Sequence, residues 1–470
     1  MGFRTTGILG LLFIGLLAFL YFYEIGGEEA RRKAAEDAKK VFSIDEEQVK
    51  RVSVRRRDTT LVCVKDGDLW QIVEPIRTDG DRGSIESLIR SVKNLERTGA
   101  IADSEDVASG EVELADFGLK DPDATLALER SDGDADTLYL GDKSPTGSYA
   151  YLRRSGDPGI LATNAWRKSG LEKGLFDLRD KRVLPFDRDD VRKIEVTGSG
   201  REVVLVRQEG EWHLEKPIQD RADEDAVKRL LSRLHTVRAR GFSANEAADP
   251  SRYGLADPRL EVSLYEGEGL AKKTSVFGDP IRVGGKLRYH GKYLPKAPVF
   301  QVDSSLVGDV NKTPSDLRIK EIFAFDSTGV DRVTLAYSDS LVDCARDTVG
   351  DGWDVLHPPS VTLSSTMEDL IDDVNDLKAE GYVDGEAPHP ADYGLDPPQV
   401  RVTIRRGSDV VREVAVGKVG EETYASVDGR TQIVEVKERI LNRLKVRLTP
   451  MEPDAAADTT RAEIPGASGG

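Results

Sequence analysis

Hydrophobic positions recur with helical spacing in three separate parts of the chain. In each part the apolar residues are spaced 3, 1, 3 and 3 apart, which is one face of an amphipathic helix of about four turns. A glycine follows each set at a similar offset, where we expect it to end the helix. The helices are predicted over 85–95, 227–237 and 367–377, and the glycines are Gly99, Gly241 and Gly381.

Alternating hydrophobic and polar residues surround each predicted helix and predict strands. Runs such as TLVCV, EVVLV and DRVTLAY precede the helices, and ATLALER, LEVSLYEG and VRVTIRRG follow them. Polar turns such as KDGD and RQEGE separate the runs, as is typical of antiparallel hairpins. The pattern predicts an α+β fold in which one amphipathic helix covers an antiparallel sheet, three times in tandem.

Three motifs recur in the same order with a period of about 141 residues. A Trp-x-x-x-x-Pro segment comes first, then an aromatic-Gly-Leu turn that ends in proline, then another glycine 23 or 24 residues beyond the turn glycine. We expect a tryptophan packed beneath each helix, a strand ended by the first proline and a turn glycine at positive φ. These structural signature residues are Trp70, Pro75, Gly118, Pro122 and Gly141; Trp212, Pro217, Gly254, Pro258 and Gly278; and Trp353, Pro358, Gly394, Pro398 and Gly417.

The segment 7–23 predicts a membrane-spanning helix. It holds seventeen residues without a charge, and as a helix it would rise ~25 Å, close to the ~30 Å core of a bilayer. A cleaved signal peptide is the alternative interpretation, but bulky residues follow the run where a cleavage site needs small ones. Residues 28–40 combine alanine with Glu-to-Lys/Arg pairs four apart and have no apolar stripe, which predicts a solvated helical stalk.

Two near-identical junctions mark the boundaries between repeats: FDLRDKRVLPFD from Phe176 and SDLRIKEIFAFD from Ser315. Arg4 and the free amine favour a cytoplasmic N-terminus, whereas the basic residues at 31–33 argue for the opposite orientation; we expect the N-terminus inside. The expected segments are a cytoplasmic tail over 1–6, the transmembrane anchor over 7–23, the stalk over 24–45, repeat units over 46–185, 186–324 and 325–450, and a disordered tail over 451–470.

The composition and the motifs of the chain argue against nucleic-acid binding, metal binding and catalysis. The net charge of −17 disfavours nucleic acid as a partner, and 39% hydrophobic with 32% charged residues describes a soluble body behind the anchor. Cys63 and Cys344 fall in different repeats outside any metal-ligand spacing, so we expect small buried side chains. No HExxH, CxxC or GxSxG motif occurs, and GDPIRVGGK fails as a phosphate loop. We therefore predict no catalytic residue, no metal and no cofactor, although a site assembled from distant residues would leave no local signature.

The order of these motifs resembles the family called domain of unknown function 4340 (DUF4340), in three copies over about 46–450. The third copy departs from the pattern, because LNRLKVRL replaces the DLR-type junction. The resemblance implies an N-terminal membrane anchor with the repeats outside the cytoplasm, often beside gliding-type ABC transporter components. It supplies no catalytic residues, because no activity is established for the family.

The expected function is that of a non-catalytic interaction module on the periplasmic side of the inner membrane, with ABC transporter or envelope protein subunits as partners. A second hypothesis is a binding module for cell-envelope polysaccharide or peptide that uses grooves between repeats, with exposed aromatics such as Tyr149 and Tyr151. Stacking of sugar rings on the three repeated tryptophans is the alternative to their packing role. A third is an envelope hydrolase.

Overall fold

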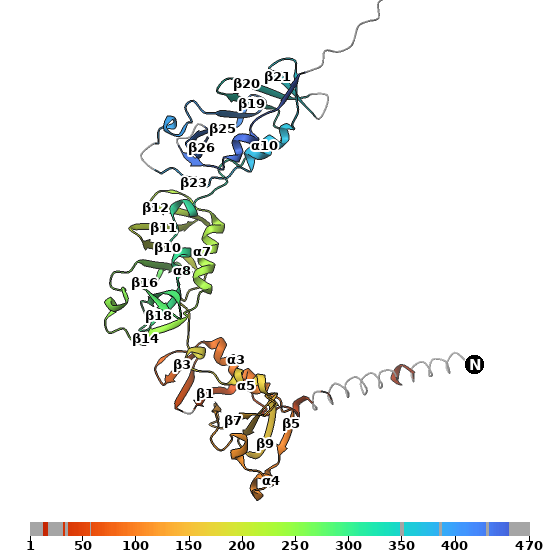
Figure 1. The fold of residues 1–470 in the computed structure, drawn as a ribbon, viewed down its shortest axis with the longest axis vertical. Coiled ribbons are helices and arrows are strands. Elements are labelled where there is room, and N and C mark those ends of the chain that lie inside the picture. Colours follow the sequence, from red (N-terminus) through yellow and green to blue (C-terminus); the bar gives the residue numbers. More distant parts are fainter. Residues whose placement is uncertain are drawn as a thin grey trace, which may run out of the picture. The chain divides into compact units, whose positions relative to one another are not determined.

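A computed structural model describes residues 13–16, 32, 36–56, 58–347, 352–384, 388–428 and 432–450 (Figure 1). The expected tails over 1–6 and 451–470, and most of the anchor and of the stalk up to residue 35, lie outside the described residues. Among the described residues, no helix is long and apolar enough to cross a membrane. The chain divides into two compact units: Met1–Val183 with Arg238–Ala248 and Ala297–Val302, and Leu184–Val237 with Asp249–Lys296 and Asp303–Gly470.

The first repeat is an antiparallel sheet with nine described strands in the order β4-β3-β2-β1-β6-β7-β8-β9-β5. Each neighbouring pair runs antiparallel, as the hairpin pattern of the sequence predicts. The strands are β1 (Val49–Arg56), β2 (Thr59–Asp66), β3 (Leu69–Glu74), β4 (Thr78–Asp79), β5 (Gly99–Ala102), β6 (Ala124–Arg130), β7 (Ala135–Lys143), β8 (Tyr149–Arg154) and β9 (Asp157–Asn164). The helices are η2 (Glu46–Gln48), α3 (Arg82–Lys93), α4 (Ser104–Ser109), η3 (Leu114–Phe117), α5 (Ala165–Leu171) and α6 (Leu175–Leu178).

Helix α3 covers the main core of the first repeat with the apolar face that the sequence predicts. The Asp81 side chain caps its N-terminus by accepting from the Ser84 amide, and Ile85, Leu88, Ile89 and Val92 are buried. The expected stop at Gly99 is wrong, because α3 ends at Lys93. Gly99 instead begins strand β5 and pairs with Ala162 of β9. Gly241 and Gly381 likewise begin strands β14 and β23, so these glycines belong to the returning edge strand.

The second repeat has its strands in the order equivalent to that of the first repeat. In the second unit its strands follow the order β13-β12-β11-β10-β15-β16-β17, and in the first unit β18 pairs with β14. The strands are β10 (Val191–Gly198), β11 (Arg201–Gln208), β12 (Glu211–Lys216), β13 (Asp220–Arg221), β14 (Gly241–Ala244), β15 (Leu260–Glu266), β16 (Ala271–Val283), β17 (Lys286–Tyr293) and β18 (Val299–Asp303). The helices are α7 (Glu224–Thr236), η4 (Pro250–Tyr253), α8 (Ser304–Val310) and α9 (Pro314–Leu317).

The third repeat, in the second unit, has the described strand order β21-β20-β19-β24-β25-β26-β27-β23, with a separate pair β22-β28. The strands are β19 (Arg332–Tyr337), β20 (Leu341–Arg346), β21 (Trp353–His357), β22 (Val361–Leu363), β23 (Gly381–Tyr382), β24 (Val400–Arg406), β25 (Asp409–Val419), β26 (Glu422–Val427), β27 (Ile433–Glu435) and β28 (Leu448–Pro450). The helices are α10 (Met367–Asn375), η5 (Pro390–Tyr393) and α11 (Arg439–Arg443). The architecture is therefore α+β in tandem repeats, which confirms the predicted class.

Residues near two of the expected boundaries pack into the repeat that follows them. Val41, Phe42 and Ile44, expected in the stalk, are buried in the core of the first repeat. The backbone there is tied to the repeat, since the Val41 amide donates to the carbonyl of Leu95 at 2.8 Å. Phe323, expected in the second repeat, is buried in the core of the third. The core of the first repeat therefore includes residues from Val41 onward, and the core of the third includes Phe323.

Candidate functional site

The signature tryptophans and their prolines lie at the ends of equivalent strands. Trp70 in β3 and Trp212 in β12 are buried, 2% and 4% exposed. Trp353 in β21 is half-buried and donates from Nε1 to Glu368 Oε1 at 2.7 Å. Strands β3, β12 and β21 end at the residue before Pro75, Pro217 and Pro358, and each of these prolines follows a cis peptide bond.

The aromatic-Gly-Leu turn is a short 3₁₀ helix that ends on a left-handed glycine. The φ angles of Gly118, Gly254 and Gly394 are 65°, 66° and 67°. Side chains rarely adopt this conformation, so the turn favours glycine in each repeat. Pro122, Pro258 and Pro398 follow the turns and are half-buried.

The second signature glycine lies directly beneath the turn. A Cβ added to Gly141 would come within 2.2 Å of the Phe117 carbonyl oxygen. The equivalent distances are 2.1 Å from Gly278 to the Tyr253 oxygen and 1.9 Å from Gly417 to the Gly394 oxygen. Strands β7, β16 and β25 run past these glycines. The spacing of 23 or 24 residues between the two glycines thus reflects a close backbone contact that leaves no room for a side chain.

The aromatic residue of each turn packs edge-on against a ring from the third strand after the turn, which is β8, β17 or β26. The ring centroids are 4.8 Å apart for Phe117–Tyr151, 5.1 Å for Tyr253–His290 and 5.0 Å for Tyr393–Tyr424. In the first repeat, Phe117 and Tyr151 pack against a small second core that includes Ile160 of β9. Leu161, the next residue of β9, belongs instead to the core beneath α3. Successive strand residues point to opposite faces, so the turn covers the sheet face opposite α3. The signature residues therefore build the repeat, and two of them, Gly254 and Pro258, also line a surface groove.

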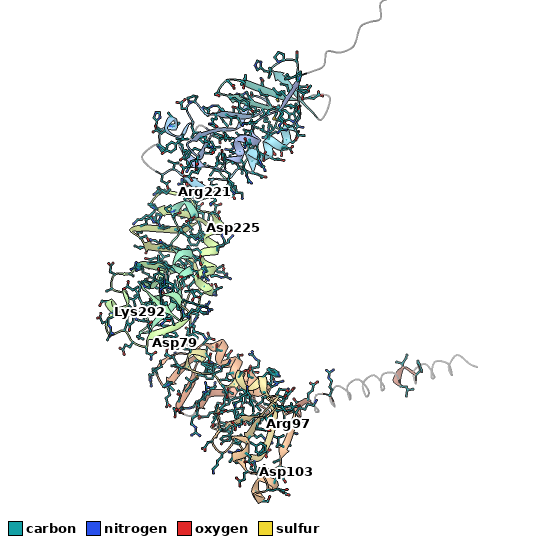
Figure 2. The ribbon with its side chains drawn as sticks, viewed as in Figure 1. Asp79, Arg97, Asp103, Arg221, Asp225 and Lys292 are labelled. Atoms are coloured by element: carbon teal, nitrogen blue, oxygen red, sulfur yellow. The ribbon has the colours of Figure 1, made fainter. Side chains whose placement is uncertain are left out.

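The junction motif places a buried arginine in the first unit. Arg179, directly after α6, is 3% exposed. Its Nε donates to Thr78 Oγ1 at 3.1 Å, its Nη1 donates to Asn245 Oδ1 at 2.9 Å, and its Cζ lies 3.7 Å from the Phe242 ring centroid. Burial lowers the pKa of Arg179, while the nearby charge of Asp79 in β4 (labelled in Figure 2) opposes that shift. This arginine thus links β4 of the first repeat to the segment around β14 of the next.

An equivalent arginine lies in the second unit. Arg318, directly after α9, is 5% exposed. Its Nε donates to Asp220 Oδ2 at 2.6 Å, its Nη1 donates to Asp384 Oδ1 at 2.7 Å, and its Cζ lies 3.5 Å from the Tyr382 ring centroid. In both junctions the polar partner in the following repeat is 66 residues further along the chain. We call Arg179 and Arg318, with these partners, the first and second arginine junctions.

The repeated Asp-Leu-Arg motif, which marks the boundaries between repeats in the sequence, contains the arginine of each junction. The motif by itself does not indicate that this arginine is buried. The segment that enters each repeat is also repeated: KKVFSID from Lys39, KRVLPFD from Lys181 and KEIFAFD from Lys320. The carbonyls of these three lysines accept from the amides of Arg97, Ala239 and Ala379 at 2.8, 2.8 and 2.9 Å. At the first entry Asp37 takes the arginine position, and exposed Ala100 stands where Phe242 and Tyr382 stand in the other repeats. The first repeat is therefore entered without an arginine junction.

The grooves among the described residues carry mixed charge. One of about 290 Å³ beside α7 is lined by Arg229, Arg233, Lys312, Asp309 and Asp316, and Arg233 Nε bonds Asp309 at 2.8 Å. A second, of about 450 Å³, contains the ion pair Arg259–Asp279 at 3.4 Å. The second groove is also lined by Ser251, whose hydroxyl donates to Asp249 Oδ1 at 2.5 Å at the start of η4. A serine and an aspartate at a helix start are typical of a cap, and this pair has no histidine between them as a serine nucleophile would need.

Metal and thiol chemistry find no support in the described part of the chain. No group of three or more His, Cys, Asp or Glu side chains there is placed to hold a metal ion. Burial raises the pKa of the Cys63 thiol to about 12, and burial together with Asp343 raises that of Cys344 to about 11. Thiols so far from ionisation are poor nucleophiles.

Comparisons with known proteins identify the class. The family described as "Domain of unknown function (DUF4340)" matches residues 70–251, 212–398 and 364–465. The chain therefore belongs to this family, as the order of its motifs indicated. The first two matches begin at Trp70 and Trp212, and each extends past one 141-residue period into the following repeat. The family pattern thus includes the junction between repeats.

No curated protein matches the chain. Among solved structures, the DNA polymerase III subunit beta from Pseudomonas aeruginosa is 7% identical, with 83% of this chain and 93% of that chain covered and a TM-score of 0.15. At that TM-score the likeness supports no conclusion about fold or function.

Proposed function

We propose that this protein is a non-catalytic interaction module, tethered to the inner membrane by residues 7–23, with its repeats on the periplasmic side. In this proposal it is an accessory to an ABC-type transport or cell-envelope machine and binds protein subunits of that machine. The uncharged run of seventeen residues supports the anchor, and the described part of it, residues 13–16, is helical with Phe13 and Ile14 exposed.

The observation that carries this proposal is the pair of arginine junctions. Repeats joined by a flexible linker would leave these arginines in solvent, yet Arg179 and Arg318 are buried against the following repeat. Burying a guanidinium is costly unless it is hydrogen-bonded, so the sequence maintains specific contacts at both junctions. Consecutive repeats held by such contacts suit a scaffold that presents neighbouring surfaces to a protein partner.

The use of the signature residues favours a scaffold over an enzyme. The glycines, prolines and tryptophans common to the repeats serve turns, strand ends and cores. A hydrolase would need polar groups that converge in a pocket. The described grooves are lined instead by acidic and basic side chains close enough to neutralise each other.

Photo-crosslinking in intact membranes tests the partner. The full chain would carry a photoreactive residue at exposed Leu287 or Val410, and the control would be the same chain without the probe. The proposal predicts that ABC transporter or envelope subunits are captured only with the probe. Capture of neither class from either position would contradict it.

Vesicle flotation tests the anchor separately. The full chain is expected to float with lipid vesicles, and a variant in which Leu11, Leu12, Ile14 and Leu17 are replaced by aspartate is expected to stay at the bottom of the gradient, because charge at the bilayer centre is costly. If the unsubstituted chain stays at the bottom, it has no membrane anchor.

A further inference from the structure

Two exposed aromatic residues lie close in the fold at one corner of the first repeat. Tyr149, the first residue of β8, is 44% exposed, and Trp166, the second residue of α5, is 70% exposed. Tyr149 pairs in register with Asn164, the residue that precedes α5. The start of β8 and the start of α5 therefore share a corner, which we call the aromatic corner.

The same corner is polar in the other repeats. His290 is the ring partner of Tyr253 as Tyr151 is of Phe117, so Arg288, two residues before His290, corresponds to Tyr149. Arg288 forms an ion pair with Asp303 at 3.9 Å. Ser305, the second residue of α8, corresponds to Trp166 and accepts from Arg233 at 3.0 Å. In the third repeat the residue that corresponds to Tyr149 is the exposed Glu422.

The aromatic corner lies beside the point where the chain enters the first repeat. The guanidinium of Arg167 lies 4.8 Å from the Trp166 ring centroid. Its Nη1 donates to the carbonyl of Asn94 at 2.8 Å, and its Nη2 donates to Glu96 Oε2 at 3.3 Å. Glu96 is in turn the β-bridge partner of Lys40 on the entering segment. A basic group therefore lies beside the tryptophan, next to the chain that leads back to residues 7–23.

We propose that the aromatic corner rests in the headgroup region of the bilayer, beside the anchor. This inference rests on the proposed membrane tether. Tryptophan and tyrosine combine an apolar ring with a polar atom and favour the membrane–water interface. The repeat nearest the anchor has the aromatic pair, while the repeats further along the chain have ionic or polar residues at that corner.

The length of the linker makes this contact possible. Sixteen residues separate Tyr23, the end of the expected span, from Lys40. As a helix they would extend ~24 Å, less than the ~30 Å diameter of a small domain. A linker of that length would therefore hold the first repeat closer to the lipid than its own width.

Lipid quenching of tryptophan fluorescence tests the contact on the full chain. The protein would be reconstituted in vesicles of phosphatidylcholine and phosphatidylglycerol, with or without brominated phosphatidylcholine. The chain has four tryptophans, none of them in 7–23, and Trp70 and Trp212 are buried. We expect bromine to remove about a quarter of the emission, because one tryptophan of four lies at the interface. Trp166→Phe should abolish that loss, and Trp353→Phe should preserve it.

The outcomes separate this inference from the proposed tether. A chain that floats with the vesicles but shows equal emission with and without brominated lipid keeps its anchor, and the aromatic corner then does not touch lipid. A photoreactive residue at position 166 that captures a protein in preference to lipid would also overturn the inference. A chain that does not float overturns both proposals.

Discussion

The first and second arginine junctions share their geometry but differ in the chemistry of their partners. Arg179 bonds two neutral groups, Thr78 and Asn245, and its buried Nη2 has no hydrogen-bond partner among the described residues. Arg318 bonds two carboxylates, Asp220 and Asp384. Each guanidinium also lies against one aromatic ring of the following repeat. The position of the arginine is therefore common to both junctions, while the neutralisation of its charge is not.

This difference indicates how each junction is stabilised. Charge-assisted hydrogen bonds to carboxylates are stronger than those to neutral acceptors, and a buried cation without an anion retains part of its desolvation cost. Burial lowers the pKa of Arg179, which agrees with a weakly compensated charge. We therefore expect the second junction to contribute more to stability than the first.

The largest effect is expected from Arg318→Ala. Removing the guanidinium leaves Asp220 and Asp384 near each other without a cation. We expect a loss of about 3 kcal/mol, at the lower end for a broken buried pair because both carboxylates reach solvent. Hydrogen exchange would measure it: the amide of Asp223, which donates to Leu317 O at 2.7 Å, should exchange about a hundredfold faster.

Arg221→Ala is the matched control. Arg221 is also paired, with Glu211 at 3.3 Å, but both side chains are more than half exposed. Its loss should change stability by less than about 0.5 kcal/mol. If Arg221→Ala and Arg318→Ala have equal effects, the second junction is an ordinary surface ion pair.

A smaller loss, about 2 kcal/mol, is expected from Arg179→Ala, because its partners are neutral and one nitrogen is already unsatisfied. The equivalent amide is that of Asp81, which donates to Leu178 O at 2.7 Å. Its exchange should accelerate by about thirtyfold. A greater effect here than for Arg318→Ala would reverse the order of the two junctions.

Exchanging the acceptors should make the junctions more alike. Asn245→Asp places a carboxylate against Arg179 and should stabilise the first unit by about 1 kcal/mol. Asp384→Asn should destabilise the second junction by a similar amount. Urea unfolding of the full chain, monitored by hydrogen exchange at the amides of Asp81 and Asp223, would detect both changes. Destabilisation by Asn245→Asp would mean that the charge of Arg179 does not limit the stability of its junction.

The aromatic ring beside each arginine should contribute least. Phe242→Leu removes the cation–π contact with Arg179 and should cost about 0.5–1 kcal/mol. Tyr382→Phe keeps the ring beside Arg318 but removes the bond from its hydroxyl to the Ile319 carbonyl, and so reports that bond alone. Thermal unfolding of each variant would rank them. A loss above about 2 kcal/mol for Phe242→Leu would make packing of the ring the main contact of the first junction.

The family, the period and the elements of each repeat could be predicted from the sequence, because they rest on local patterns. Helical spacing over eleven residues determines which face of α3 is buried, and a turn that needs positive φ selects a glycine such as Gly118. The ends of elements were harder to predict. Helix α3 stops at Lys93 and not beside Gly99, because the chain leaves the helix to form strand β5, Gly99–Ala102, which pairs with β9.

The tertiary structure decided what the recurring residues do for one another. That Gly141 lies beneath the Phe117 carbonyl, and that Arg179 and Arg318 reach residues 66 positions away, depends on which strands become neighbours. Local periodicity has no information about such contacts, because they form only when the sheet is assembled. The sequence by itself thus determined a repeated α+β unit of the DUF4340 family, and the packing of those units determined that its junction arginines are buried.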